Sequence, residues 1–266
     1  MFTINHLIWS VISVAVIVTA LVLCKKYKLS LKTVLTIACI VSAASEFIKL
    51  FSSIELVPSA SGERFYPYIK MQHLPLHLCS LQIIFILYAR FAKDGKKKEI
   101  LYAFMYPSCV LGAFFALLLP SIFTGASPSV PVAEAFTRPL AYQFFLFHSM
   151  LIVLGLYIPL SGEVKMSTKH YFTTLAFLGV TALLSLYVNS MFAQPVYQDS
   201  VLVSVEYIPN FFFTCETPIG IKLTELWHWY VYIAILLALA VTLIAAFYIP
   251  YFVRDYKAKK SNIKKE

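Results

Sequence analysis

The sequence predicts an all-α fold, a polytopic bundle of about seven transmembrane helices. Hydrophobic residues make up 60% of the chain and charged residues 13%, with a mean hydropathy of +0.77, whereas a soluble domain carries about 25% charged residues. Seven apolar stretches are each long enough to cross a hydrocarbon core of about 30 Å as a helix. These stretches are residues 5–24, 31–51, 73–91, 99–119, 139–160, 171–192 and 226–250. We expect one transmembrane bundle domain over residues 1–252 and a basic tail at 253–266.

The basic residues predict the orientation of the bundle. Of the 22 Lys and Arg residues, 17 lie in alternate connections and in the tail. These segments are 25–32, 90–99, 161–170 and 253–266. The positive-inside rule then places the N-terminus outside and the C-terminus in the cytoplasm, which an odd number of spans requires. We expect a multi-pass protein of the cell membrane. Its net charge of +9 indicates contact with anionic lipid headgroups at the cytoplasmic face, not with nucleic acid.

The five cysteines suggest neither a disulfide framework nor a zinc site. Cys24, Cys39, Cys79, Cys109 and Cys215 fall in five different segments without zinc-ligand spacing. We therefore expect no metal and no cofactor, and most of the thiols are expected to pack as small apolar groups.

Six of the seven stretches place a polar side chain in the half of the membrane that is expected to be outer. Intramembrane polar groups normally face the bundle interior, so this shared depth predicts an outward-facing polar cavity. The side chains are His6, Glu46, His77, Cys79, His148, Asn189 and His228. Structural alternatives stay open for most of them. Glu46 could pair with Lys49, Asn189 and His77 could bond to a neighbouring helix, and His228 could lie at the interface. Cys79 could be an inert thiol, and a structural role for His148 stays equally open.

The segment His-Leu-Pro-Leu-His-Leu-Cys-Ser at 73–80 is the richest in chemistry. A helix that begins near Pro75 would place His77 and Ser80 on one face, in register with His73, and Cys79 about 200° from His77. Cys79 would then lie just beyond the unpaired N–H groups of the first turn.

A thiol attacks an acyl carbon once a neighbouring base removes its proton. We expect Cys79 to pair with His148 on another helix, with Glu46 or Asn189 orienting the imidazole. Asn189, Ser80 or backbone N–H groups are candidate oxyanion donors. A metal site built from His73, His77, His148 and Glu46 is less favoured, because the two histidines of 73–77 lack the adjacent glutamate of a metallohydrolase helix.

Several motifs resemble the YwaF family of bacterial integral membrane proteins, which is distantly similar to the eukaryotic transmembrane protein 164 acyltransferase. The motifs are Leu-Pro-Leu-His-Leu-Cys-Ser-Leu at 74–81, Phe-Phe-Leu-Phe-His-Ser at 144–149, Tyr-Val-Asn at 187–189 and Trp-His-Trp-Tyr at 227–230. The resemblance implies remodelling of phospholipids through a membrane cysteine and histidine, and His77 and His148 match best. The eukaryotic cysteine comes immediately before the histidine, where this chain has Leu76, so Cys79 is displaced by three residues. His228 stands where the family has proline.

The leading functional hypothesis is lipid acyl transfer or acyl hydrolysis, with Cys79, His148 and His77 as catalytic candidates. Glu46, His73, Ser80, Asn189 and His228 would orient them or line the pocket. The alternative is a non-catalytic membrane protein that binds or transports a small ligand through the same cavity. Polar groups in one half of the membrane argue against an open channel, although alternating access could supply a second path.

Overall fold

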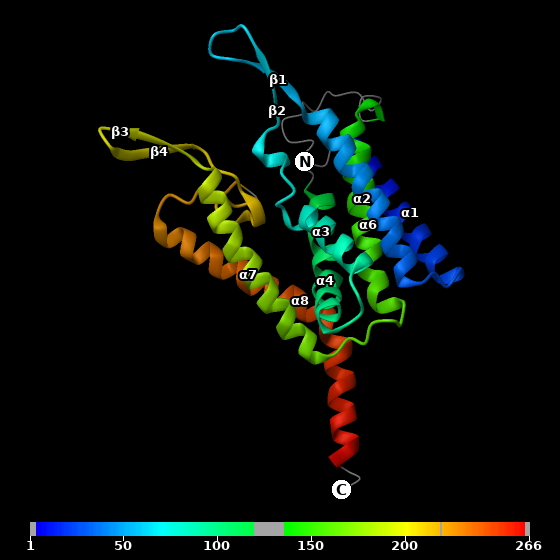
Figure 1. The fold of residues 1–266 in the computed structure, drawn as a ribbon. Coiled ribbons are helices and arrows are strands. Elements are labelled where there is room, and N and C mark those ends of the chain that lie inside the picture. The colour runs from blue at the N-terminus through cyan, green and yellow to red at the C-terminus, as the bar shows by residue number, and fades with distance from the viewer. Residues whose placement is uncertain (1–3, 120–135, 219, 264–266) are drawn as a thin grey trace. The chain divides into compact units, whose positions relative to one another are not determined.

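The computed structural model describes residues 4–119, 136–218 and 220–263, and it confirms the all-α membrane class (Figure 1). Six helices in these ranges are long and apolar enough to cross a membrane. They are α1 (Ile4–Lys26), α2 (Leu31–Ser53), α4 (Lys96–Leu118), α6 (Pro139–Leu160), α7 (Thr168–Phe192) and α8 (Leu226–Ile263). A seventh, α3 (Leu78–Phe91), is apolar but shorter.

Two β-hairpins, which the sequence analysis did not predict, follow membrane helices directly. Strand β1 (Glu55–Pro58) pairs with β2 (Phe65–Tyr68) after α2, and β3 (Gln194–Gln198) pairs with β4 (Val201–Tyr207) after α7. Both pairs are antiparallel. In the second hairpin Asp199 and Ser200 both have positive φ angles, as a tight two-residue turn requires.

The chain forms two compact units. The first contains residues 1–75 and 79–165, and the second contains residues 76–78 and 166–266.

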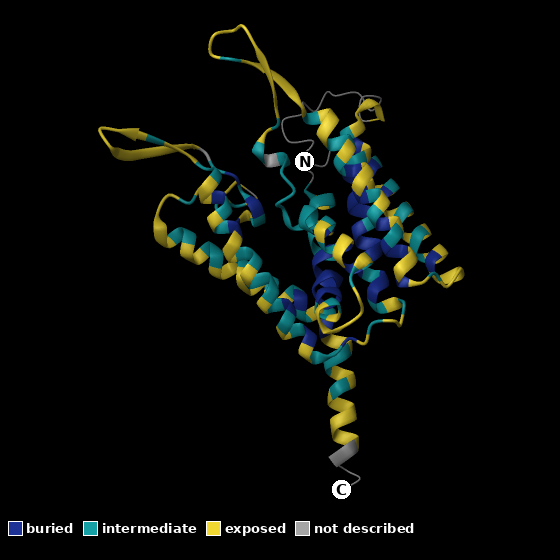
Figure 2. Cartoon of the chain, viewed as in Figure 1, coloured by how far each residue is buried: buried dark blue, intermediate teal, exposed yellow. Residues whose placement is uncertain are grey.

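Helix α6 is the centre of the first unit and contacts α4, α2 and α1. Its residues and those of α4 are the most deeply buried helical residues of this unit (Figure 2). At Gly155 the two helices approach so closely that a Cβ atom would lie 2.7 Å from Val110 Cγ2 and 2.9 Å from the Tyr106 carbonyl oxygen. A small residue permits this approach, as is common between membrane helices.

Aromatic and polar contacts join the other helices of this unit. The Trp9 ring on α1 stacks on Phe145 of α6, with ring centroids 5.1 Å apart. The His6 imidazole donates through Nε2 to the Leu117 carbonyl on α4 at 2.8 Å. On α6, the Gln143 amide donates to the Ser45 hydroxyl of α2 at 2.7 Å. Polar side chains from α1, α2 and α6 thus serve packing between helices, where such bonds contribute about 0.6 kcal/mol each.

The third apolar stretch is only partly helical, so the expected helix from near Pro75 is wrong. A short 3₁₀ turn, η1 (Met71–His73), precedes a non-helical link, and α3 begins at Leu78. Its 14 residues span about 21 Å, less than the hydrocarbon core. Pro75 disfavours helical geometry in Leu74, the residue before it, so the turn η1 ends there and is not continuous with α3.

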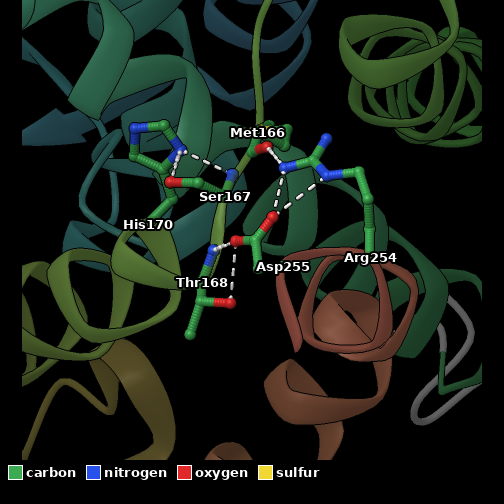
Figure 3. A network of polar contacts seen from close by, with 6 residues as sticks. All are labelled: Met166, Ser167, Thr168, His170, Arg254 and Asp255. Carbon is green, nitrogen blue, oxygen red and sulfur yellow. Dashed lines mark hydrogen bonds and ion pairs between the residues drawn. The ribbon is translucent and has the colours of Figure 1, made fainter. Parts of the chain in front are cut away.

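In the second unit α7 and α8 run antiparallel where α7 begins, since Thr168 bonds to Asp255 and Thr174 to Tyr248. Figure 3 shows the polar contacts at this point. The Asp255 carboxylate accepts from the Thr168 backbone N–H at 2.9 Å and from its hydroxyl at 3.0 Å. Arg254 donates to the Met166 carbonyl, and the backbone N–H of Ser167 donates to Nδ1 of His170 at 3.1 Å. Asp255 therefore supplies an acceptor and a negative charge to the first turn of α7, where both are stabilising.

The other end of this unit contains a strained loop. Phe212 and Phe213, in the 3₁₀ turn η3 (Phe211–Phe213), have φ angles of 60° and 53°. Left-handed backbone is costly for bulky residues and persists only when the surroundings impose it. The imposing contacts come from α7 and α8, as described below.

Candidate functional site

His148 is the best-defined candidate for a base. It lies within α6 and is 8% exposed. Its Nδ1 is 2.6 Å from the Phe144 carbonyl oxygen one turn earlier. Since a carbonyl only accepts, Nδ1 carries the proton, and the lone pair of the neutral ring is on Nε2. A backbone carbonyl thereby fixes the tautomer that a general base at Nε2 requires.

Cys79 and Ser80 are the second and third residues of α3, because that helix begins at Leu78. Both side chains are partly buried. The expectation that Cys79 would lie beyond the first turn is therefore wrong. The first-turn N–H groups of a helix have no partner within the helix and can stabilise negative charge. Cys79 and His148 both belong to the first unit.

His73 and His77 do not share a helix face, contrary to the expectation. His73 ends η1, and His77 lies in the link before α3. Partial burial lowers the pKa of His73, and the ammonium groups of Lys49 and Lys70 lower it further. His73 is therefore neutral near pH 7. Within the described ranges no three His, Cys, Asp or Glu side chains gather as a metal-ligand set.

Glu46 is engaged by Lys49 one turn later on α2, with Nζ and Oε1 2.7 Å apart. The alternative in which Glu46 pairs with Lys49 is therefore the arrangement that the structure shows. An ion pair at this spacing stabilises a helix locally, and it occupies the carboxylate that was expected to orient His148.

Asn189 is also used within the protein and is fully buried. Its Nδ2 donates to the Phe211 carbonyl at 3.1 Å and to the Thr214 hydroxyl at 2.9 Å. Its Oδ1 accepts from the Phe211 backbone N–H at 3.0 Å. Because both amide hydrogens are donated, Asn189 is not placed to stabilise an oxyanion. It fixes the strained loop instead.

The same loop carries the neighbour of His77. The His77 ring meets the Phe211 ring edge-on, with centroids 4.9 Å apart, inside the second unit. From α8, Trp229 Nε1 donates to the Thr214 carbonyl at 2.8 Å. Asn189 and Trp229 thus hold the segment whose first phenylalanine packs on His77. Sequence reasoning found Asn189 but not its partners.

His228 opens α8 and faces its own neighbours. Its Nδ1 is 3.2 Å from the Thr224 hydroxyl, and its ring lies 3.9 Å from the Trp227 ring. These local contacts fit the interfacial reading.

A buried polar cluster that the sequence analysis did not assign joins α3 to α4. The Gln82 amide donates to the Ser108 hydroxyl at 3.0 Å, and the Cys109 thiol donates to Gln82 Oε1 at 3.2 Å. All three side chains are buried. The sequence carries a signal for this cluster: Gln82 is a polar residue within an apolar stretch, and the next stretch contains the adjacent polar pair Ser108 and Cys109.

Six long apolar helices with polar groups buried between them define a multi-pass helical membrane protein. The chain belongs to the TMEM164 family, whose model matches residues 1–251. This match covers nearly the whole chain and bears out the distant similarity to transmembrane protein 164. The assignment to the YwaF family is not confirmed by it. No curated protein and no solved structure matches the chain.

Proposed function

We propose that this protein is an enzyme of the cell membrane that transfers or hydrolyses lipid acyl groups, with Cys79 as nucleophile and His148 as base. The supporting observation is the His148 tautomer: the Phe144 carbonyl holds the proton on Nδ1, so Nε2 can accept one. Apolar surroundings favour the neutral thiol, so attack by Cys79 needs such a base. Family membership supports lipid chemistry.

The proposed reaction has two steps. His148 Nε2 takes the thiol proton while the Cys79 sulfur bonds to the ester carbonyl carbon of a phospholipid. The carbon–oxygen bond to the glycerol then breaks, and the imidazolium returns the proton to the departing lysolipid oxygen. A hydroxyl group, from a second lipid or from water, attacks the thioester in turn and releases the Cys79 thiol. N–H groups of the first turn of α3 are candidate donors to each oxyanion.

His77 enters this proposal through the resemblance and through its place two residues before Cys79. His73 and Ser80 flank the same segment, and we propose that they would line the pocket that admits the acyl chain. Glu46, Asn189 and His228 are assigned to ion pairing, loop positioning and the interface, so no catalytic step passes through them.

The test compares purified wild type with Cys79→Ala and His148→Gln, using phospholipid with a labelled acyl chain. Wild type is expected to form a hydroxylamine-sensitive acyl-protein, and Cys79→Ala is expected to form none. His148→Gln should form it at a rate roughly 10²- to 10⁴-fold lower, as loss of a general base predicts. Cys39→Ala is the matched control, because Cys39 is also partly buried in the same unit and should label normally.

Labelling that persists in Cys79→Ala would refute the nucleophile assignment. Wild type that binds the lipid but never forms an acyl-protein or lysolipid would instead support the non-catalytic alternative.

A further inference from the structure

Helix α8 is much longer than a membrane requires. Its 38 residues, with Pro250 among them, amount to about 57 Å measured along the helix, against a hydrocarbon core of about 30 Å. Aromatic residues begin it with Trp227 and Tyr230, and a second aromatic group follows at 248–252. Tyr171 of α7 packs on that second group, with ring centroids 5.9 Å from Tyr248 and 5.3 Å from Phe252. Such aromatic belts mark the two membrane–water boundaries.

Cations begin immediately beyond the second belt. Exposed basic side chains, here termed the basic collar, surround this end of the second unit: Lys169, Arg254, Lys257, Lys259 and Lys260. The acid among them, Asp255, bonds to Thr168 and forms an ion pair with Arg254 (Figure 3). Five cations and one carboxylate leave the collar a net charge of +4, which its four lysines carry.

The cations are spread around α8 instead of forming one face. At 100° per residue, Lys257, Lys259 and Lys260 lie about 300°, 140° and 240° from Arg254. An acidic protein that docks on one side would require one basic face, and a helix lying on the membrane would require an apolar face opposite the cations. A ring of cations fits a helix end that is surrounded by a layer of negative headgroups.

The depth of the collar agrees with this arrangement. Lys257 lies five residues beyond Phe252, about 8 Å along the helix, and the headgroup layer is about 5–8 Å thick on each side. Long lysine side chains reach back toward the headgroups. Asp255 accepts a hydrogen bond from Thr168, and Arg254 donates one to the Met166 carbonyl. These bonds fix the part of α8 from which the collar extends.

We propose that the basic collar binds the phosphate groups of anionic phospholipids that surround the end of α8. This surface is separate from the acyl-transfer chemistry of Cys79 and does not depend on it. Each cation near an anionic surface strengthens attraction several-fold, and salt weakens it.

The experiment reconstitutes the full chain in phosphatidylcholine nanodiscs doped with phosphatidylglycerol, and measures retained phosphatidylglycerol by native mass spectrometry. Changing Lys257, Lys259 and Lys260 to glutamine is expected to lower phosphatidylglycerol affinity at least tenfold and to leave phosphatidylcholine retention unchanged. The corresponding lysine-to-arginine triple should retain wild-type affinity. A charge-matched control, Arg64, Lys70 and Lys222 changed to glutamine, should have a smaller effect.

Equal losses in the collar variant and the charge-matched control would overturn the proposal, since net charge alone would then explain binding. Undiminished phosphatidylglycerol retention in the collar variant would also overturn it. Displacement of the lipid by soluble glycerol phosphate would mark a site for free phosphate instead. Collar-dependent capture of an acidic peptide with unchanged lipid retention would mark a protein-binding site.

Discussion

Replacing Asn189 with leucine should release the loop that packs on His77. The substitution removes three hydrogen bonds, two to Phe211 and one to Thr214. Side-chain bonds inside membrane proteins contribute about 0.6–1 kcal/mol each, which gives about 2 kcal/mol for the three. The Phe211 carbonyl still accepts from the Thr214 hydroxyl, but its N–H loses Oδ1, and an orphaned buried donor costs a further 1–3 kcal/mol or so.

The total of about 3–5 kcal/mol should appear as local opening before any helix unfolds. Phe212 and Phe213 hold left-handed backbone that relaxes once its constraint is lost. Hydrogen–deuterium exchange in detergent micelles measures this directly. A loss of 3 kcal/mol corresponds to roughly 150-fold faster exchange for the amides of residues 210–216, with the amides of α6 unchanged.

Two further variants make the result interpretable. Thr181→Val is the matched control, because the Thr181 hydroxyl bonds only to carbonyls of its own helix α7 and should change little. Asn189→Asp keeps an acceptor for the Phe211 N–H and should give an intermediate effect. If Asn189→Leu exchanged no faster than Thr181→Val at residues 210–216, Asn189 would not be holding the loop.

Three other predictions concern packing, acid stability and topology. Gly155→Ala should lower thermal stability by about 1–2 kcal/mol because its Cβ would meet α4, whereas Gly179→Ala, with open space around it, should be neutral or slightly stabilising; equal melting temperatures would contradict this. Hydrogen bonds from Thr168, with Arg254 beside it, lower the pKa of Asp255 to about 2, so its stabilisation is present above about pH 4 and disappears between pH 4 and 2. Asp255→Asn should be less stable than wild type at pH 7 and lose that acid-dependent step in the thermal melt. In a background without the native cysteines, a membrane-impermeant maleimide should label Ser200→Cys but not Lys257→Cys on intact cells, and labelling of both would refute the seven-span topology.

The helices could be predicted because the bilayer leaves an apolar chain little choice. Backbone N–H and C=O groups in hydrocarbon must bond within their own segment, so each run of about 20 apolar residues becomes a helix. Pro75 breaks this rule within the third stretch, and α3 starts at Leu78. A proline in a first turn predicts a helix start near Pro75, but the non-helical link continues to His77.

The partners of polar residues were predictable only where they are close in sequence. Glu46 and Lys49 lie one turn apart, and their ion pair forms as the spacing indicated. Asn189 binds a loop that begins about 20 residues later and contains left-handed phenylalanines. No local rule favours that backbone, since left-handed geometry is normally left to glycine or asparagine. Contacts from α7 and α8 impose it, and such contacts are a property of the folded unit.

Depth in the membrane therefore identifies polar residues without assigning their role. Glu46 and Asn189 share a predicted depth with His148, yet both use their polar groups in contacts that hold the protein together. His148 is also bonded, to the carbonyl of its own preceding turn, and this contact fixes its tautomer. A proton on Nδ1 leaves the lone pair of the neutral ring on Nε2, which is the state that a general base requires. His148 is therefore the residue on which the acyl-transfer proposal is most directly tested.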